Sequence, residues 1–307
     1  MLRDAPVLKG IVLICISFFS MTATDAVTKF AVQSIHPIEL TFWRFVAQVV
    51  VVFFLFRLWN HVDKLKTSRP VANLARGVCH GITTALFFLA VQSLQLAQAT
   101  TILFAMPLMV TILAGPILGD WPTRASIVAA AVGFVGVIII TDPFGGSINP
   151  AMLYAVAAAV VYTGYTLLTR SLVRTETDQT LLFYSAVAGS LALLPMAYPY
   201  IGVGEGKAYW LACVICAGGM TAHWIFQHAY RFASAAVLTP FMYTQLIWTV
   251  IIGYLIFSDI PPLTTVLGSV VIIGAGLYNF LYERNAHKKS RGQKESPEVS
   301  PGPSAAE

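Results

Sequence analysis

Two charged residues, Asp25 and Lys29, stand four positions apart inside an apolar stretch that covers residues 9–32. On a helix, residues four apart share one face. A charge near the centre of a membrane helix costs about 2.5–3.5 kcal/mol on insertion scales, so such charges usually serve a function. The pair is predicted either to face a solute, binding its carboxylate or amine groups or exchanging a proton, or to neutralise itself while Lys29 reaches the membrane surface.

Polar and aromatic residues form stripes on other apolar stretches. Tyr162, Tyr165 and Thr166 share one helical face, as residues spaced by three and four do,. Further candidates for solute binding or coupling are His223, Gln227, Tyr243 and Trp248. Rings of this kind suit an aromatic, planar or cationic solute. The alternative is a hydrogen bond between helices, a contact of about 0.6 kcal/mol on average.

Two further charges, Glu39 and Arg44, open the stretch 38–59. Arg44 is the deeper of the two and needs a partner, for which Asp25 and Glu39 are the candidates. We expect a structural role for both Glu39 and Arg44.

Signatures of other chemistry are weak. The pair Cys213 and Cys216 has the spacing of half a metal or redox site, but no second pair accompanies it,. No Gly-x-x-x-x-Gly-Lys-Ser/Thr segment for ATP occurs,. The sequence therefore predicts no metal, no cofactor and no catalytic residue, and a process driven by ion or solute gradients.

The elements that carry these residues are membrane helices. Hydrophobic residues make up 57% of the chain and charged residues 11%, against about 25% charged in soluble domains. A bilayer core needs roughly 20 apolar residues per helix, and ten such stretches are predicted: 9–32, 38–59, 71–94, 97–118, 124–141, 151–170, 179–201, 208–230, 235–257 and 262–283. The fold class is all-α integral membrane.

The net charge of +5 reflects the sidedness of the membrane rather than binding to nucleic acid. Placing the N-terminus in the cytoplasm puts nearly all Lys and Arg of the loops and helix ends on that side, Arg76, Arg124 and Arg170 among them. Lys207 is the one that lies in an outer loop,. The prediction is an inner-membrane, multi-pass protein in the lipid bilayer with both termini cytoplasmic.

The second half of the chain repeats the first. Residues 40–46 match residues 181–187, Lys29 meets Arg170 at the same offset, and residues 119–123 match residues 258–262. Each half holds five helices, an odd number, so the second half enters the membrane from the opposite side. Inverted repeats of this kind serve alternating access. The predicted units are 1–143 and 149–283, followed by a disordered cytoplasmic tail at 284–307 that is too polar to pack.

Small residues at Ala125, Ala129 and Gly133 let helices approach closely,. They are predicted to pack within the chain, with a homodimer seam as the alternative.

The ordered set of Lys29, Pro37, Leu40 and Arg44, with residues 97–99, 107–108 and 119–123, resembles the drug/metabolite transporter superfamily, EamA-type branch, over residues 8–283. Asp120 and Asp259 stand where the family usually has Glu, and Leu246 stands where the first half has Pro107. The resemblance implies a transporter without ATP hydrolysis for a small-molecule substrate, with a cavity between the two halves. It implies export of amino acids or related metabolites, or alternatively import of a larger metabolite such as S-adenosylmethionine or riboflavin. A membrane channel and an integral-membrane enzyme are the alternatives from other classes.

Overall fold

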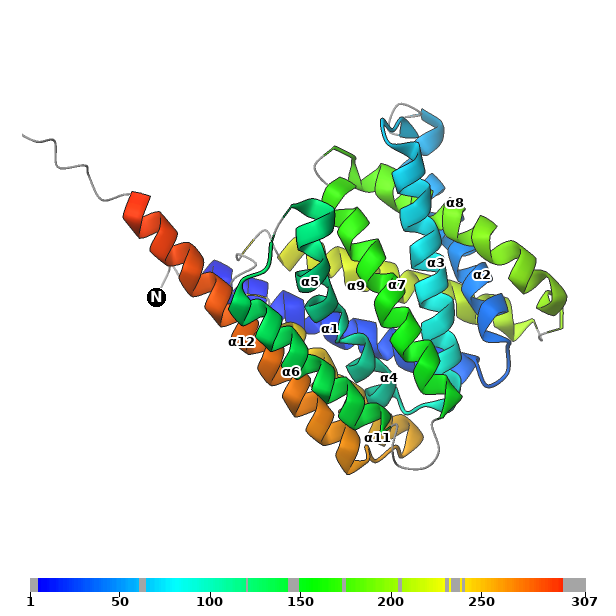
Figure 1. The fold of residues 1–307 in the computed structure, drawn as a ribbon. Coiled ribbons are helices and arrows are strands. Elements are labelled where there is room, and N and C mark those ends of the chain that lie inside the picture. The colour runs from blue at the N-terminus through cyan, green and yellow to red at the C-terminus, as the bar shows by residue number, and fades with distance from the viewer. Residues whose placement is uncertain are drawn as a thin grey trace, which may run out of the picture.

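The structure is a computed structural model, and it describes residues 5–60, 65–119, 121–142, 149–172, 175–203, 206–229, 232, 238 and 241–294. Over these residues it consists of helices and connecting turns (Figure 1). The elements are α1 Ala5–Ala31, α2 Pro37–Leu55, η1 Leu58–Asn60, α3 Pro70–Ser93, α4 Leu96–Leu103, α5 Met106–Leu118, α6 Arg124–Thr141, α7 Pro150–Leu172, α8 Asp178–Ala197, η3 Tyr198–Tyr200, α9 Lys207–Ala229, α11 Thr244–Phe257 and α12 Leu263–Lys294.

The predicted all-α membrane fold is confirmed. In the described part of the chain, 9 helices are long and apolar enough to cross a membrane, with α4 and α5 together making one of them. The remaining predicted stretch, 235–257, is represented by the shorter apolar helix α11. Most of residues 233–243 lie outside the described residues.

Local sequence signals set the helix ends. Proline occupies the first turn of α2, α3 and α5, where its missing N–H costs no hydrogen bond,. Thr123 and Thr177 cap α6 and α8 by accepting a hydrogen bond from the backbone N–H three residues on,. Gly119 ends α5 with a φ of 76°, a left-handed conformation that glycine adopts without strain,.

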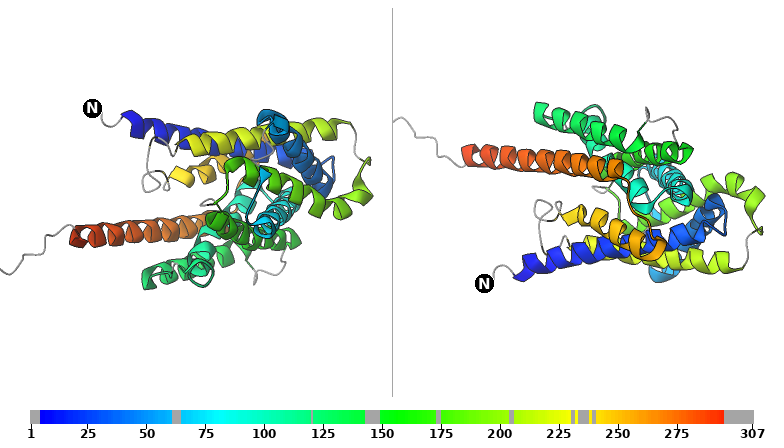
Figure 2. Two further views of the ribbon diagram at one scale, coloured as in Figure 1. Left: turned by 90° about the horizontal axis from the view of Figure 1, so that it is seen from above. Right: turned by 90° about the horizontal axis from the view of Figure 1, so that it is seen from below.

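Hydrogen bonds between helices establish that the two repeats run in opposite directions. Gln92, near the end of α3, donates to the carbonyl of Val32 just after α1 (3.0 Å), so α1 and α3 end together. Arg69, just before α3, donates to Ser171 Oγ near the end of α7 (2.9 Å), so α7 ends where α3 begins. We call the end of the bundle where α1 begins the proximal end and the other the distal end. Figure 2 shows the N-terminal end of α1 and the C-terminal end of α12 extending from the same side.

Helices α6 and α12, the last of each repeat, pack closely together through small residues. A Cβ added at Gly136 would lie 2.8 Å from Cγ1 of Ile272, and one added at Gly133 would lie 3.5 Å from Cβ of Ala275. Asp120 and Asp259 set an offset of 139 residues (259 minus 120), under which Gly133 corresponds to Ile272 and Gly136 to Ala275. The two contacts are therefore related by the repeat, and Gly133 packs within the chain.

The C-terminal end differs from the expected disordered tail. Helix α12 continues to Lys294, through residues such as Leu281, Glu283 and Ala286 that favour helix,. Residues 295–307 lie outside the described residues.

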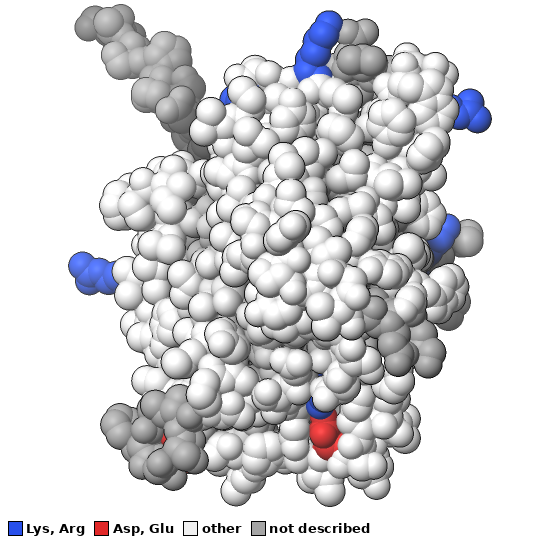
Figure 3. Space-filling view, turned by 90° about the vertical axis from the view of Figure 1, so that its right-hand side faces the viewer, with Lys and Arg blue, Asp and Glu red and all other residues white. Residues whose placement is uncertain are grey.

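The outer surface of the bundle is apolar. Many large hydrophobic side chains are exposed, including Phe54, Leu191 and Leu255 at 61%, 61% and 74%. The face in Figure 3 carries charged side chains only toward its edges. A surface of this kind is stable in lipid, which has no hydrogen bonds to offer polar groups.

Candidate functional site

The site is built on Arg44, in the second turn of α2. Its Nη1 donates to Thr84 Oγ1 of α3 at 3.3 Å. The guanidinium also lies 5.2 Å from the ring centroid of Phe45 and interacts electrostatically with Asp25 of α1. Of the two partners expected for Arg44, the structure brings Asp25 to it.

Three rings from α3 and α7 continue the site. Tyr162 stacks on Tyr165, with ring centroids 5.6 Å apart, and Tyr165 stacks on His80 at 4.8 Å. The edge of this stack meets Phe45, 5.1 Å from His80. Arg44 therefore lies beside a short ladder of aromatic rings.

His223 of α9 completes what we call the central cluster, which consists of Asp25, Arg44, His80, Tyr162, Tyr165 and His223. Electrostatic interactions link His223 to Arg44 and His80, and Asp25 to Tyr162. His223 has an exposed side chain although it sits amid the other members, and the remaining five are partly exposed. Charged groups within membrane helices almost always face the interior of the bundle, because contact with lipid would be costly. The members of the central cluster come from α1, α2, α3, α7 and α9 and interact with one another, in keeping with such a position.

Arg76 supports the cluster from the proximal side. Its Nη2 donates to Tyr165 Oη at 3.0 Å and its Nε to Thr169 Oγ1 at 2.7 Å. Its Nη1 donates to the carbonyl of Leu181 (2.9 Å) and to Ser185 Oγ (2.6 Å). Gly77 makes this reach possible, because a Cβ there would lie 2.6 Å from Cβ of Ala188 on α8. Arg76 was predicted to be one of the basic residues at the cytoplasmic ends, but the prediction did not include its burial: it is 5% exposed and engaged between helices.

Lys29 does not pair with Asp25. Its Nζ lies 2.5 Å from Oδ2 of Asp259 and 4.7 Å from the ring centroid of Phe257. Asp259 follows α11 in the second repeat, so this ion pair crosses between the repeats at the distal end. Self-neutralisation of the pair, one of the two alternatives predicted from the four-residue spacing, is therefore wrong, because Lys29 pairs with Asp259 and Asp25 interacts with Arg44.

Other contacts also join the repeats at the distal end. Buried Glu39 accepts a hydrogen bond from the N–H of Gly202 at 3.3 Å, in keeping with a structural role. His36 stacks on Tyr200 at 3.5 Å, and its side chain accepts from the N–H of Ile38. Burial lowers the pKa of His36 below its ordinary value, and the nearby Glu39 carboxylate partly opposes this effect.

The structure gives local or other partners to three of the remaining predicted site residues, Thr166, Tyr243 and Trp248. Thr166 bonds back to the carbonyl of Tyr162 (2.9 Å) and to Met106 Sδ (3.7 Å). Tyr243 contacts Phe104 across the repeats, with centroids 5.7 Å apart. Trp248 packs edge-on against Phe19 at 5.2 Å. The side chain of Gln227 lies outside those that the structure describes.

The cysteine pair is not arranged as a metal site. Cys213 is exposed and Cys216 is buried, and the Cys216 thiol contacts Met220 Sδ at 3.8 Å. Among the described residues, no group of three His, Cys, Asp or Glu side chains could hold a metal ion.

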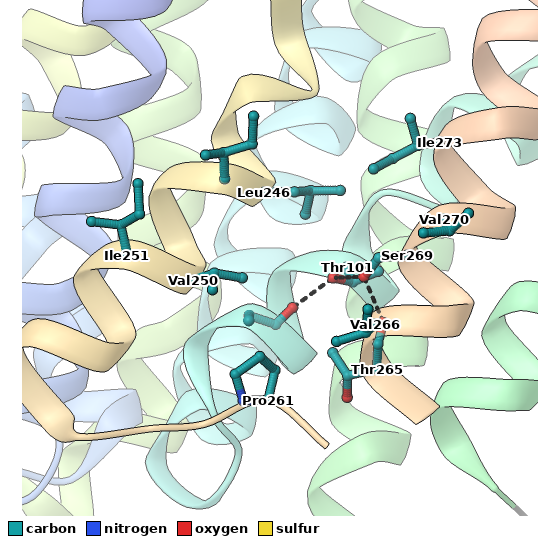
Figure 4. Close-up of a pocket in the computed structure, with 12 residues that line it drawn as sticks. Thr101, Leu246, Val250, Ile251, Pro261, Thr265, Val266, Ser269, Val270 and Ile273 are labelled. Atoms are coloured by element: carbon teal, nitrogen blue, oxygen red, sulfur yellow. Dashed lines mark hydrogen bonds between the residues drawn. The ribbon is translucent and has the colours of Figure 1, made fainter. Parts of the chain in front are cut away.

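A separate hollow of about 320 Å³ lies between α4, α11 and α12 (Figure 4). Its walls are almost wholly apolar, and Pro261, on the linker between α11 and α12, contributes to them. Two of its hydroxyls are engaged locally: Thr101 Oγ1 and Ser269 Oγ are 3.1 Å apart, and Ser269 donates to the carbonyl of Thr265. The hydroxyl of Thr265 is buried without a hydrogen-bond partner among the described residues. The hollow contains none of the central cluster.

Sequence reasoning gave too little weight to three residues of this region: His80, Arg76 and Asp259. His80 was noted as polar on its helix, but its stacking on Tyr165 depends on how α3 packs on α7. Arg76 is indistinguishable in sequence from a loop-side arginine. The sequence did contain a signal for Asp259, because the repeat pattern singles out both the cation Lys29 near the end of α1 and the acid Asp259 after α11.

Comparison with known proteins finds a transporter family that matches both halves of the chain, and transporters of similar sequence. The sequence matches the EamA-like transporter family twice, over residues 8–142 and 149–281. An S-adenosylmethionine uptake transporter from Rickettsia felis is 30% identical, covering 91% of this chain and 95% of that protein. A riboflavin transporter from Vibrio cholerae is 31% identical over 64% of this chain and 65% of its own length.

A solved crystal structure has the same fold, with a TM-score of 0.60 over 92% of this chain and 99% of its own, at 16% identity. The matched relatives are named as transporters rather than enzymes. With its two five-helix repeats, this multi-pass membrane protein belongs to the EamA-like transporter family of the drug/metabolite transporter superfamily.

Proposed function

We propose that this protein is a secondary transporter that takes up a small organic solute by alternating access, with the central cluster as its solute site. The observation that carries the proposal is the electrostatic interaction of the partly exposed Asp25 and Arg44, within membrane helices and beside stacked rings. The inverted repeats support a mechanism in which two related halves exchange conformations around such a site.

The chemistry of the central cluster suits a solute with a zwitterionic head and a flat ring. Arg44 presents a planar fork that matches a carboxylate. Asp25 presents an anion for an ammonium or another cation. The faces of Tyr162 and Tyr165 suit an aromatic ring. S-adenosylmethionine has a carboxylate, an ammonium, a sulfonium and an adenine ring, and the Rickettsia felis relative is named for its uptake.

Riboflavin is the second candidate because the ring ladder alone suits its flat ring system. Two relatives are named riboflavin transporters, one of them 25% identical over 80% of this chain. Riboflavin lacks a zwitterionic head, so it leaves the charges of Asp25 and Arg44 without direct partners. The charged pair therefore favours the first candidate, and the names of the relatives favour uptake over the export of amino acids expected earlier.

The proposed location is the bacterial inner membrane, with the proximal end in the cytoplasm. Exposed Arg69, Arg124 and Arg170 lie at the proximal end, as the positive-inside rule requires for that orientation,.

The test is binding followed by flux. Purified protein is screened by thermal shift against S-adenosylmethionine, riboflavin and a panel of amino acids, and any solute that raises Tm is followed into proteoliposomes. A carrier gives saturable uptake that unlabelled solute on the other side accelerates. A linear, unsaturated flux would identify a pore instead, and the absence of binding by every solute in the panel would count against this solute class.

A further inference from the structure

The distal end of the bundle is held shut by side chains from both repeats. Gln95 donates to the carbonyl of Ile260 at 3.1 Å, and the stacked His36 and Tyr200 lie at the same end. The one charged tie described there is between Lys29 and Asp259. Lys29 stands one helical turn beyond Asp25 on the same face of α1, so the ion pair lies directly distal to the central cluster,.

The ion pair is well enclosed, and the linker that carries Asp259 borders a hollow. The Lys29 side chain is 11% exposed and that of Asp259 is 21% exposed. The ring of Phe257 covers the ammonium. Asp259 lies on a short linker whose Pro261 borders the apolar hollow in Figure 4. The linker therefore borders unfilled space between α4, α11 and α12.

The cation at the equivalent position in the second repeat is more exposed than Lys29. Lys29 corresponds to Arg170, which lies at the proximal end of α7 and is exposed. Two cations at equivalent positions, one buried in an ion pair and one exposed, are what an inverted repeat produces when its two ends are in unequal conformations.

We infer that the Lys29–Asp259 ion pair is the gate that closes the distal end of the solute pathway. The gate rests on the proposed transport function, since a pathway must exist for it to close. While the pair is intact, α1 and the α11–α12 linker are joined over the central cluster. Separation of the pair frees the linker and opens the cluster to the distal side.

The chain contains a native reporter for this opening. Cys216 is 3% exposed and its thiol interacts electrostatically with Arg44, so it borders the central cluster from α9. A background with Cys15→Ala, Cys79→Ala and Cys213→Ala leaves Cys216 as the single thiol. A membrane-impermeant maleimide then measures access to the cluster from each side of the membrane. Val203→Cys, in an exposed loop at the distal end, identifies which side is distal.

The experiment compares Asp259→Asn and Lys29→Gln with the unaltered pair, in sealed vesicles of both orientations and without solute. Each substitution is expected to raise the rate of Cys216 labelling from the distal side about tenfold, equivalent to about 1.4 kcal/mol of bias toward the closed state. Labelling from the proximal side is not expected to rise. The charge-swapped double variant K29D/D259K restores an ion pair and is expected to return the distal rate toward its original value.

The control is Asp142→Asn, which removes an exposed carboxylate at the distal end that ends α6. It is expected to leave the rate unchanged. An unchanged distal rate in both Asp259→Asn and Lys29→Gln would overturn the gate, as would an equal rise from both sides, which indicates a loosened bundle. Because labelling needs no solute, failure of the gate is distinguishable from failure of the proposed solute class, which the binding screen tests.

Discussion

Phe104 and Tyr243 occupy equivalent positions in the two repeats, 139 residues apart, and their rings are in contact with centroids separated by 5.7 Å. Two repeats that are related by a pseudo-twofold axis can bring equivalent residues into contact only where these residues lie beside that axis. Phe104 also stands at the break between α4 and α5, and Tyr243 immediately precedes α11. The axis that relates the repeats therefore passes next to interrupted backbone in the middle of the bundle.

A double-mutant cycle tests whether this contact between equivalent residues of the two repeats stabilises the protein. Phe104→Leu and Tyr243→Leu are each expected to lower stability, and the double variant less than additively, with a coupling of about 0.5–1.5 kcal/mol for an aromatic pair. Thermal unfolding in detergent gives the four values. Strict additivity of the two stability losses would mean that the contact between the two rings does not stabilise the folded protein.

Arg76 is expected to position Tyr165. Arg76→Lys removes the planar fork that serves acceptors on α7 and α8 and leaves buried groups without donors,. We expect a loss of stability of about 1–3 kcal/mol and weaker solute binding, both read by thermal shift with and without solute. Arg170→Lys is the matched control, since Arg170 is exposed on α7. A wild-type Tm for Arg76→Lys would contradict the role.

Asp25→Asn keeps the shape of the side chain and removes its charge. If Asp25 receives a cationic group of the solute, uptake falls about tenfold or more, while membrane abundance changes little, because a charge-assisted contact is worth roughly 1.5–3 kcal/mol. Asp178→Asn, at an exposed position in the first turn of α8, is the control. Parallel losses of abundance and uptake in Asp25→Asn would assign the carboxylate a structural role.

A larger residue in the close packing between α6 and α12 is expected to lower the stability of the protein rather than its affinity for solute. In Gly268→Leu, even the new Cβ would lie 2.6 Å from the carbonyl oxygen of Gly136. Overpacking of this kind typically costs about 1–3 kcal/mol. We expect lower abundance and Tm but an unchanged Kd in the surviving protein. An unchanged Tm with a loss of dimer would instead place this close packing between two copies of the chain.

Much of the fold follows from the sequence because lipid imposes a simple rule on it. Apolar stretches of spanning length, proline at helix starts and repeated turn motifs predicted helices such as α6 at 124–141, which the structure has as Arg124–Thr141,. The match of residues 40–46 to 181–187 predicted two repeats. The tail was harder, because composition alone does not reveal that a membrane helix continues beyond the bilayer.

The side-chain partners could be predicted only in part. Tyr162 and Tyr165 share a stripe on one helix, and they do stack. Partners from different helices depend on packing that a single sequence does not encode locally. Lys29 was assigned to Asp25 by spacing, whereas helix packing brings it Asp259 from the other end of the chain. Arg76 was placed at the cytoplasmic end of its predicted helix by charge alone, and the sequence did not reveal that Gly77 lets α3 approach α8 closely enough to enclose it.

The distal end is expected to weaken as pH falls. The folded pKa of His36 lies below its ordinary value of 6.5, because burial disfavours the charged ring against the pull of Glu39. At pH values between the folded and unfolded pKa of His36, the unfolded chain therefore binds more protons than the folded one. The free energy of unfolding rises with pH there. The stabilising contribution of His36 is lost as the pH falls below 6.5 toward the folded pKa. Protonation also removes the acceptor that His36 offers to the N–H of Ile38.

His36→Asn isolates the effect, because asparagine caps a helix without titrating. Tm is measured at pH 7.5 and 5.5 for both proteins, and the acid-induced drop is expected to be smaller in the variant. Tyr200→Leu removes the stacked ring and is expected to lower Tm at both pH values. Equal acid-induced drops in wild type and His36→Asn would show that the histidine does not titrate against the stability of the distal end.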